Sequence, residues 1–287
     1  MTSIPEDSPF HYQWHEVILL RRYLQCAAFV VLWVMGGYYL RLSPLAFQLV
    51  GLPLVALFQL AVARRPLAQL WVRDAERVRL DWRVAVTAPL LFAVCAGLML
   101  HGFGKVGTAG EAQWLLALIG VAVVPAAFAV GEQRAADLRR AGGWIALALI
   151  VRWGWHAAWA PTWDGPLAFP LRKLPDFFAD WICETVALFL VDEVVFRGAL
   201  DPHIAGAGRG RLHEWCSAVF VALLWGVWHF PAWNPGAKSL LELFTHIGPD
   251  VFAAVIWGTV LSFCARRSRT LGPAAAIHAA GNAYVLT

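Results

Sequence analysis

Ionisable side chains stand inside an apolar stretch in the second half of the chain. Within the run Phe177–Leu200, Asp192 and Glu193 are followed by Arg197. Charge in a hydrocarbon layer costs free energy, so an intramembrane ionisable cluster indicates a functional site. On a helix, Glu193 and Arg197 are four residues apart and share a face, whereas Asp192 is turned about 100° from Glu193. One carboxylate can be neutralised while the other points elsewhere; the alternative is an ion pair that only fixes helix packing.

Two histidines and an asparagine stand in later apolar runs. His229 ends one run, and His278 and Asn282 share a helix face in the last one, with Gly281 between them permitting close approach of another backbone. A carboxylate and an imidazole can activate a water for attack on a carbonyl and return its proton to the leaving amine. A second imidazole and an amide can donate to the developing oxyanion. These residues point to hydrolysis, and the alternative is that each histidine is a hydrogen-bonded core residue.

Zinc is the alternative mechanism. Two histidines and a carboxylate can bind zinc and leave a position for water, but neither His229 nor His278 stands in an HExxH pattern. The favoured mechanism therefore uses no cofactor. The five cysteines are scattered in or beside apolar runs without paired spacing, which indicates buried thiols and suggests neither disulfides nor zinc.

Three further charges lie within apolar runs: Arg152, Glu184 and Asp250. Each stands about 8 to 10 residues from a predicted helix end, roughly 12–15 Å deep at 1.5 Å per residue. Charges at matching depth are expected to pair or to line a wet cavity. We therefore expect Arg152 to be neutralised by Glu184 or Asp250, and we favour a structural pair over a substrate contact.

The composition places these residues in a membrane. Of the 287 residues, 60% are hydrophobic and only 15% are charged, and the mean hydropathy is +0.60. This balance is typical of polytopic membrane proteins and unlike that of soluble globular chains. Helices are the open-ended elements that satisfy their own backbone in lipid. The predicted fold class is therefore all-α, a polytopic transmembrane helix bundle.

About nine spans are predicted, because a helix needs about 20 apolar residues to cross a bilayer. The candidates are Arg22–Leu40, Pro44–Ala63, Val84–Phe103, Ala112–Gly131, Gly143–Ala160, Phe177–Leu200, His213–Pro231, Leu240–Cys264 and Thr270–Leu286. Basic residues gather in alternate loops, at 64–83, 132–142, 201–211 and 266–269. The positive-inside rule then puts the N-terminus inside and the C-terminus outside. The basic residues are interpreted as topology signals and not as a nucleic-acid surface.

Three motifs occur in an order that resembles a protease family. The run Asp192–Arg197 resembles the EExxxR motif of the CAAX prenyl protease and bacteriocin-processing (CPBP) family of intramembrane proteases. Trp225–His229 resembles its FxxxH motif, with tryptophan for phenylalanine, and His278–Asn282 resembles its HxxxN motif. The resemblance covers about residues 177–287. Each motif is short, but the three in order on apolar helices make a fairly specific signal.

The resemblance implies a glutamate-dependent membrane endopeptidase of the abortive-infection type. Asp192 and His229 would activate water, and His278 and Asn282 would be the oxyanion donors. It also implies that residues 141–287 form the catalytic helix bundle, after N-terminal transmembrane helices of unassigned role in residues 1–140. The substrate would be a membrane-associated or lipid-modified protein or peptide.

The first motif departs from the family at its first position, where Asp192 stands for glutamate. Glu193 and Arg197 would be the supporting pair. Removing a methylene retracts a carboxylate by roughly 1 Å, and such a shift can cost about a hundredfold in rate. Asp192 acts after a compensating helix shift, or Glu193 has taken its role, or the protein is a non-proteolytic relative. The two histidines and the asparagine favour an active enzyme.

A different class of function stays open beside the protease: a membrane scaffold, channel or transporter whose buried polar groups serve structure or proton movement. The expected location is the bacterial cell (inner) membrane, crossed several times. The expected partners are the lipid bilayer and a membrane-associated protein or peptide substrate, without nucleic acid. No oligomeric state is predicted.

Overall fold

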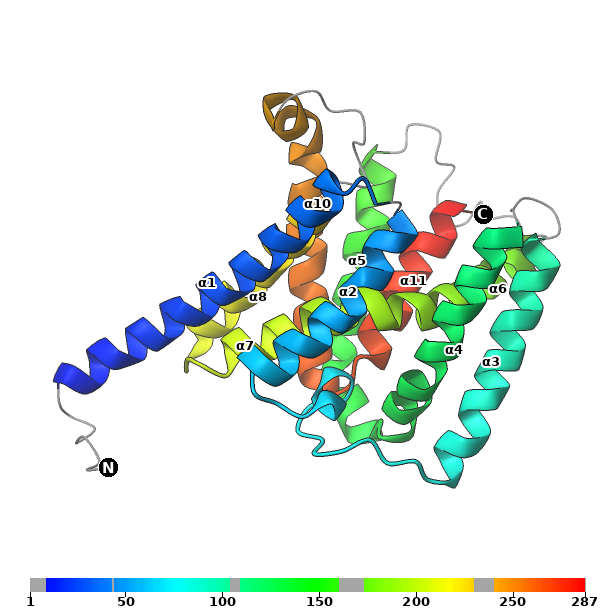
Figure 1. The fold of residues 1–287 in the computed structure, drawn as a ribbon, viewed down its shortest axis with the longest axis horizontal. Helices are drawn as coiled ribbons and strands as arrows, with labels where there is room; N and C mark the ends of the chain where they lie inside the picture. Colours follow the sequence, from blue (N-terminus) through cyan, green and yellow to red (C-terminus); the bar gives the residue numbers. More distant parts are fainter. Residues whose placement is uncertain (1–8, 43, 104–108, 160–172, 230–239, 287) are drawn as a thin grey trace. The chain divides into compact units, whose positions relative to one another are not determined.

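A computed structural model describes residues 9–42, 44–103, 109–159, 173–229 and 240–286 (Figure 1). The described residues are helical, apart from turns and an isolated antiparallel β-bridge between Val72 and Thr270. This confirms the predicted all-α class. The helices are α1 (Pro9–Tyr39), α2 (Pro44–Leu57), η1 (Phe58–Val62), η2 (Leu67–Leu70), α3 (Trp82–Phe103), α4 (Ala109–Gly131), α5 (Ala135–Trp159), α6 (Leu174–Leu188), η5 (Phe189–Leu200), α7 (Asp201–Ala205), α8 (Arg211–Trp228), α10 (Leu240–Ser268) and α11 (Gly272–Leu286).

Each of the nine predicted spans contains helix, but fewer helices meet the length and hydropathy of a crossing. Within the described residues, Glu16–Tyr39 and Val251–Ser268 are long and apolar enough to cross a membrane. A third crossing results if Leu116–Gly131 and Ala135–Arg152, which are bent by 105°, count as one broken span. Nine crossings and an inside N-terminus stay predictions.

The chain divides into two compact units. The first comprises Met1–Arg64 with Ala199–Thr259, and the second comprises Arg65–Gly198 with Val260–Thr287. The six candidate residues fall in both units. His229 belongs to the first unit, and the second unit contains Asp192, Glu193, Arg197, His278 and Asn282. Each unit is described below by itself. The predicted functional division near residue 140 stays a prediction.

An aromatic cluster holds the end of α8 in the first unit. The rings of Trp33 and Phe47 each pack against Trp228, with centroids 5.6 and 5.3 Å away. Trp33 Nε1 also donates to the carbonyl of Phe47, at 3.2 Å. Aromatic pairs at these separations add to the stabilisation from burial. The cluster fixes the C-terminal turn of α8, where His229 follows.

In the second unit, α11 packs against α6, α5 and α4, and α3 runs beside α4 (Figure 1). Trp181 Nε1 on α6 donates to the carbonyl of Ala276 on α11 at 2.7 Å. The thiol of Cys183 on α6 contacts the carbonyl of Cys95 on α3 at 3.8 Å. Both cysteines are free and buried, as their spacing predicts. These contacts make α6 the central partner of α11.

The first motif lies on a π-helix, which the sequence does not predict. The predicted span Phe177–Leu200 is split: α6 ends at Leu188, and η5 continues with the wider i→i+5 turn. Gly198 shows how closely η5 is packed, because a Cβ there would collide with the carbonyl oxygen of Leu70. π-helical turns have poorer intrinsic stability and are frequent at functional sites, where tertiary packing maintains them.

Candidate active site

Glu193 is the centre of a buried polar cluster in the second unit. Its side chain is 0% exposed, and so is that of Arg197. Arg197 Nη1 donates to Glu193 Oε1 at 3.3 Å, which is the i, i+4 pair that the sequence predicts. The same oxygen lies 2.9 Å from Nδ1 of His278. One carboxylate oxygen on η5 therefore meets a guanidinium from its own helix and an imidazole from α11.

This arrangement compensates a charge that would otherwise be very costly. An isolated carboxylate cannot stay ionised in an apolar interior unless it is paired and hydrogen-bonded. Arg197 supplies the opposite charge and His278 supplies a second hydrogen bond. Removing one partner from a buried pair typically costs 3–5 kcal/mol, because it leaves an uncompensated charge. The contacts of Glu193 with Arg197 and His278 therefore contribute to the stability of the unit.

The contact with Glu193 sets the proton positions on His278. An ionised carboxylate only accepts hydrogen bonds, so Nδ1 carries the proton and donates it. When the ring is neutral, Nε2 carries a lone pair and can accept a proton. When the ring is protonated, Nε2 can donate to an oxyanion. Only the protonated ring thus provides the oxyanion donor that the resemblance implies for His278.

Asn282 follows His278 by one turn of α11 and contacts Arg152 of α5. Arg152 Nη2 lies 3.5 Å from Asn282 Oδ1 and donates to the carbonyl of Gly281 at 3.1 Å. Because the amide oxygen faces the guanidinium, the NH₂ group is turned the other way and can donate. This orientation suits the donor role that the resemblance implies for Asn282.

Gly281 makes room for the arginine. A Cβ at this position would lie 2.5 Å from Arg152 Nε and 3.1 Å from its Cγ. The sequence indicates a close approach at Gly281, and the structure shows that a side chain makes it. Arg152 also interacts electrostatically with Glu184, one of its two predicted partners. The other, Asp250, has its side chain outside the described residues.

Asp192 is buried, with 3% of its surface exposed. The acid that meets both Arg197 and His278, however, is Glu193. The adjacent carboxylates thus have different surroundings, as their positions on successive residues require. The resemblance implies a supporting role for Glu193, and the described contacts place Glu193 in hydrogen-bond contact with His278.

His229 of the first unit follows the last turn of α8. Its Nδ1 lies 2.8 Å from the carbonyl oxygen of Trp225, four residues earlier. A carbonyl only accepts, so Nδ1 donates and Nε2 of the neutral ring is left as an acceptor. The rings of Trp225 and Trp228 both contact the imidazole edge-on, with centroids 5.1 Å away. These contacts hold His229 in the tautomer that a general base needs.

Zinc binding by two histidines and a carboxylate is the alternative interpretation of these side chains. Among the residues that the structure describes, no group of three or more His, Cys, Asp and Glu side chains is arranged to hold a metal ion.

Comparison with known families gives one match. Residues 174–284 match the family model described as type II CAAX prenyl endopeptidase Rce1-like. No curated protein and no solved structure matches the chain. The matched segment begins at the start of α6 and contains all six candidate residues, which lie on η5, directly after α8 and on α11. Over residues 174–284, the match confirms the resemblance to the CPBP family, whose members are membrane proteases.

Proposed function

We propose that this protein is an intramembrane endopeptidase acting on a membrane-associated or lipid-modified protein or peptide. The observation that carries the proposal is the buried Glu193, which contacts both His278 and Arg197. It lies within a segment that matches a prenyl endopeptidase family. A carboxylate and two imidazoles in an apolar setting are suited to activating water and stabilising an oxyanion.

The proposed reaction is hydrolysis by activated water. A carboxylate of the Asp192–Glu193 pair and His229 take a proton from water as its oxygen bonds to the scissile carbonyl carbon. The carbonyl oxygen becomes an oxyanion, and protonated His278 and the NH₂ group of Asn282 donate to it. The carbon–nitrogen bond then breaks, and the proton passes to the leaving amine. Arg197 pairs with Glu193 and keeps its carboxylate ionised.

Which carboxylate acts is decided by separate substitutions. Asp192→Asn and Glu193→Gln remove one ionisable group each with little change of shape. The assay uses the full chain in detergent or nanodiscs, a prenylated CAAX-type peptide as probe, and mass spectrometry of the products. Loss of cleavage in Asp192→Asn alone assigns the base to Asp192, and loss in Glu193→Gln alone assigns it to Glu193. Wild-type protein that cleaves no such peptide would favour the non-proteolytic alternative.

A scaffold or transporter is the second candidate function. The full burial of both Glu193 and Arg197 favours it, because a closed ion pair also serves packing alone. The two functions differ in their products. A new peptide terminus in membranes that contain the wild-type protein supports the protease, and conservative substitutions that change only stability support the scaffold.

The membrane placement is proposed together with the activity. The match to a family of membrane proteases and the apolar helices support a membrane location. The alternating basic loops favour nine crossings of the cell (inner) membrane, with the N-terminus inside. Reporter fusions after each predicted span test this topology, and two successive loops on the same side would contradict it.

A further inference from the structure

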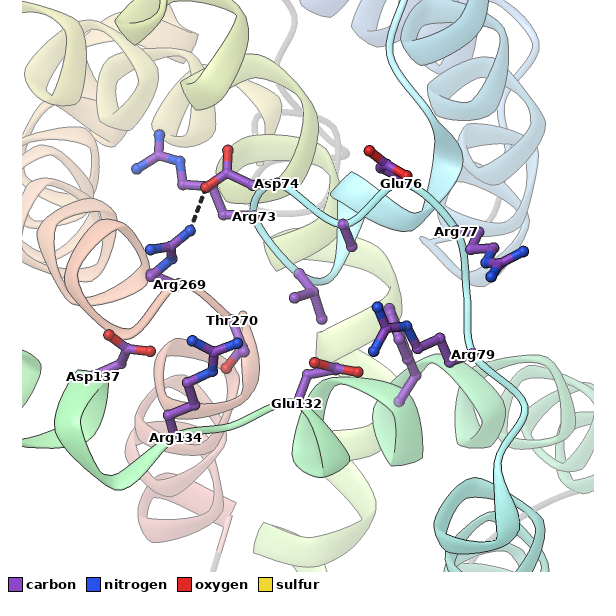
Figure 2. Close-up of a pocket in the computed structure, with 13 residues that line it drawn as sticks. Arg73, Asp74, Glu76, Arg77, Arg79, Glu132, Arg134, Asp137, Arg269 and Thr270 are labelled. Carbon is purple, nitrogen blue, oxygen red and sulfur yellow. Dashed lines mark hydrogen bonds and ion pairs between the residues drawn. The ribbon is translucent and has the colours of Figure 1, made fainter.

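The second unit contains a pocket of about 430 Å³ whose lining includes none of the motif residues. It lies where three turns meet: the segment 72–79, the bend between α4 and α5, and the turn between α10 and α11 (Figure 2). Sites for small ligands generally have volumes of about 300–1,000 Å³. The lining residues are Val72, Arg73, Asp74, Ala75, Glu76, Arg77, Arg79, Phe128, Glu132, Arg134, Asp137, Arg269 and Thr270. We call this cavity the arginine pocket.

Backbone contacts tie the walls of the arginine pocket together. Arg73 N donates to the carbonyl of Arg269 at 2.8 Å, and Leu271 N donates to the carbonyl of Trp71 at 3.1 Å. The hydroxyl of Thr270 donates to the side-chain oxygen of Gln133 in the α4–α5 bend. Gln133 Nε2 in turn donates to the carbonyl of Ser268 at 3.3 Å. The three turns are thus joined by hydrogen bonds, which fix the walls of the pocket.

The charge of the lining is positive once its ion pairs are considered. Asp74 pairs with Arg269 at 2.6 Å, and Asp137 pairs at 3.3 Å with Arg140, which lies outside the pocket. The rest of the lining holds four arginines against two glutamates. Figure 2 shows the guanidinium groups of Arg79 and Arg134 on either side of the Glu132 carboxylate. An anion bound in the pocket would gain planar donor groups from Arg79 and Arg134, with the Glu132 carboxylate as a repulsive neighbour.

Arginine forks match the oxygen geometry of phosphate groups, which they bind bidentately. Basic pockets at the cytoplasmic ends of membrane helices suit lipid head groups for the same reason. The topology interpretation of these arginines requires only their number on one side of the membrane. The topology role requires neither hydrogen-bonded turns nor a concave surface. The pocket formed by these arginines therefore indicates a binding role in addition to the topology role.

We propose that the arginine pocket binds one phosphate-bearing group, with Arg79 and Arg134 as its main ligands. Anionic phospholipid head groups and soluble phosphates share this chemistry. The site does not depend on the proposed protease activity, because its residues lie outside the motifs. Glu132 limits the pocket to one phosphate, since a second anion would face its carboxylate.

The test uses the full chain in phosphatidylcholine nanodiscs, with and without phosphatidylglycerol, and native mass spectrometry of bound lipid. Soluble phosphate is tested separately, with glycerol 3-phosphate as probe and the thermal unfolding midpoint as readout. The pocket variant is Arg79→Gln with Arg134→Gln. The control is Arg139→Gln with Arg267→Gln, which removes the same charge from exposed arginines outside the lining.

The pocket variant should lose at least about tenfold in affinity, because each charge-assisted hydrogen bond is worth about 1.4 kcal/mol or more, while the control should keep most of it. Retention of phosphatidylglycerol assigns a lipid, and stabilisation by glycerol 3-phosphate alone assigns a soluble phosphate. Glu132→Gln should raise the affinity for the phosphate probe, because it removes a repulsive carboxylate from the pocket. If the pocket variant does not fold, this gain in affinity tests the proposal instead. Equal losses in both double variants, no gain in Glu132→Gln, or binding of neither probe would overturn the proposal.

Discussion

Nδ1 of His278 lies 2.9 Å from Oε1 of Glu193, across a sequence separation of 85 residues. The same oxygen accepts from Arg197 at 3.3 Å. The contact joins η5 to α11 at a fully buried carboxylate and so fixes the rotation of α11 about its axis. Asn282, one turn further on, is thereby presented to Arg152. The candidate oxyanion donors on α11 thus depend on the acid of the first motif.

His278→Ala should therefore reduce both activity and stability. It removes a hydrogen bond to a buried charge, and such bonds are worth about 1.5–3 kcal/mol. We expect the free energy of unfolding, measured by chemical denaturation, to fall by about this amount. His278→Asn is the matched variant, because its amide can still donate to Glu193. Equal stability of wild type and His278→Ala would show that the contact is dispensable.

Arg152→Ala should destabilise the protein and lower the rate of cleavage. The change removes the donor to the Gly281 carbonyl and the contact that orients the Asn282 amide. It also removes the positive charge that interacts with the carboxylate of Glu184. A loss of about 1–3 kcal/mol is expected for an unsatisfied buried group. Adding Glu184→Gln should restore part of the stability but not the rate. Wild-type stability of Arg152→Ala would count against the pairing.

Gly281→Ala tests the close approach of Arg152 directly. The added Cβ would lie 2.5 Å from Arg152 Nε, so the guanidinium has to move. Overpacking of this kind costs about 1–3 kcal/mol. Gly154→Ala on α5 is the control, because its Cβ would meet nothing within 4 Å. That substitution should be neutral or stabilising by up to about 1 kcal/mol. The thermal unfolding midpoint should fall in Gly281→Ala and stay the same or rise in Gly154→Ala, and an equal fall in both variants would refute the steric argument.

His229→Ala should reduce the rate of cleavage by about 10²–10⁴-fold, the usual contribution of a general base. Stability should change little, because the imidazole is only half-buried and bonds to a carbonyl of its own helix turn. The measurement is the initial rate on the prenylated peptide together with the thermal unfolding midpoint. A normal rate would remove His229 from the mechanism.

Exhaustive chelation should leave the rate unchanged if the reaction needs no metal. The check is the initial rate after prolonged incubation with a strong chelator, followed by addition of zinc. A rate that falls on chelation and returns with zinc would favour the alternative in which histidines and a carboxylate hold the metal.

The sequence predicts those features of the site that depend on spacing within one helix. The Glu193–Arg197 pair follows from the i, i+4 rule, and the close approach at Gly281 follows from the missing side chain. The expected depth of Arg152 in a membrane follows from its distance to the predicted helix ends. Its contact with Asn282 does not, because hydropathy fixes depth and not the rotation of one helix against another.

Two further features have no signal in the sequence. The π-helix of η5 differs from an α-helix by one residue per hydrogen-bonded turn, and residue preferences do not distinguish them at Asp192 and Glu193. The arginines of segment 64–83 read as topology signals because their count is all that the sequence offers. Their convergence with Arg134 depends on the hydrogen bonds that join the turns.

The central claim is that a buried carboxylate activates water for peptide hydrolysis. The most direct measurement is the rate at which the Asp192→Asn, Glu193→Gln double variant cleaves the prenylated peptide, compared with wild type, with helix content checked by circular dichroism. The account predicts no detectable product from a variant that retains its helices. Cleavage at the wild-type rate would contradict it.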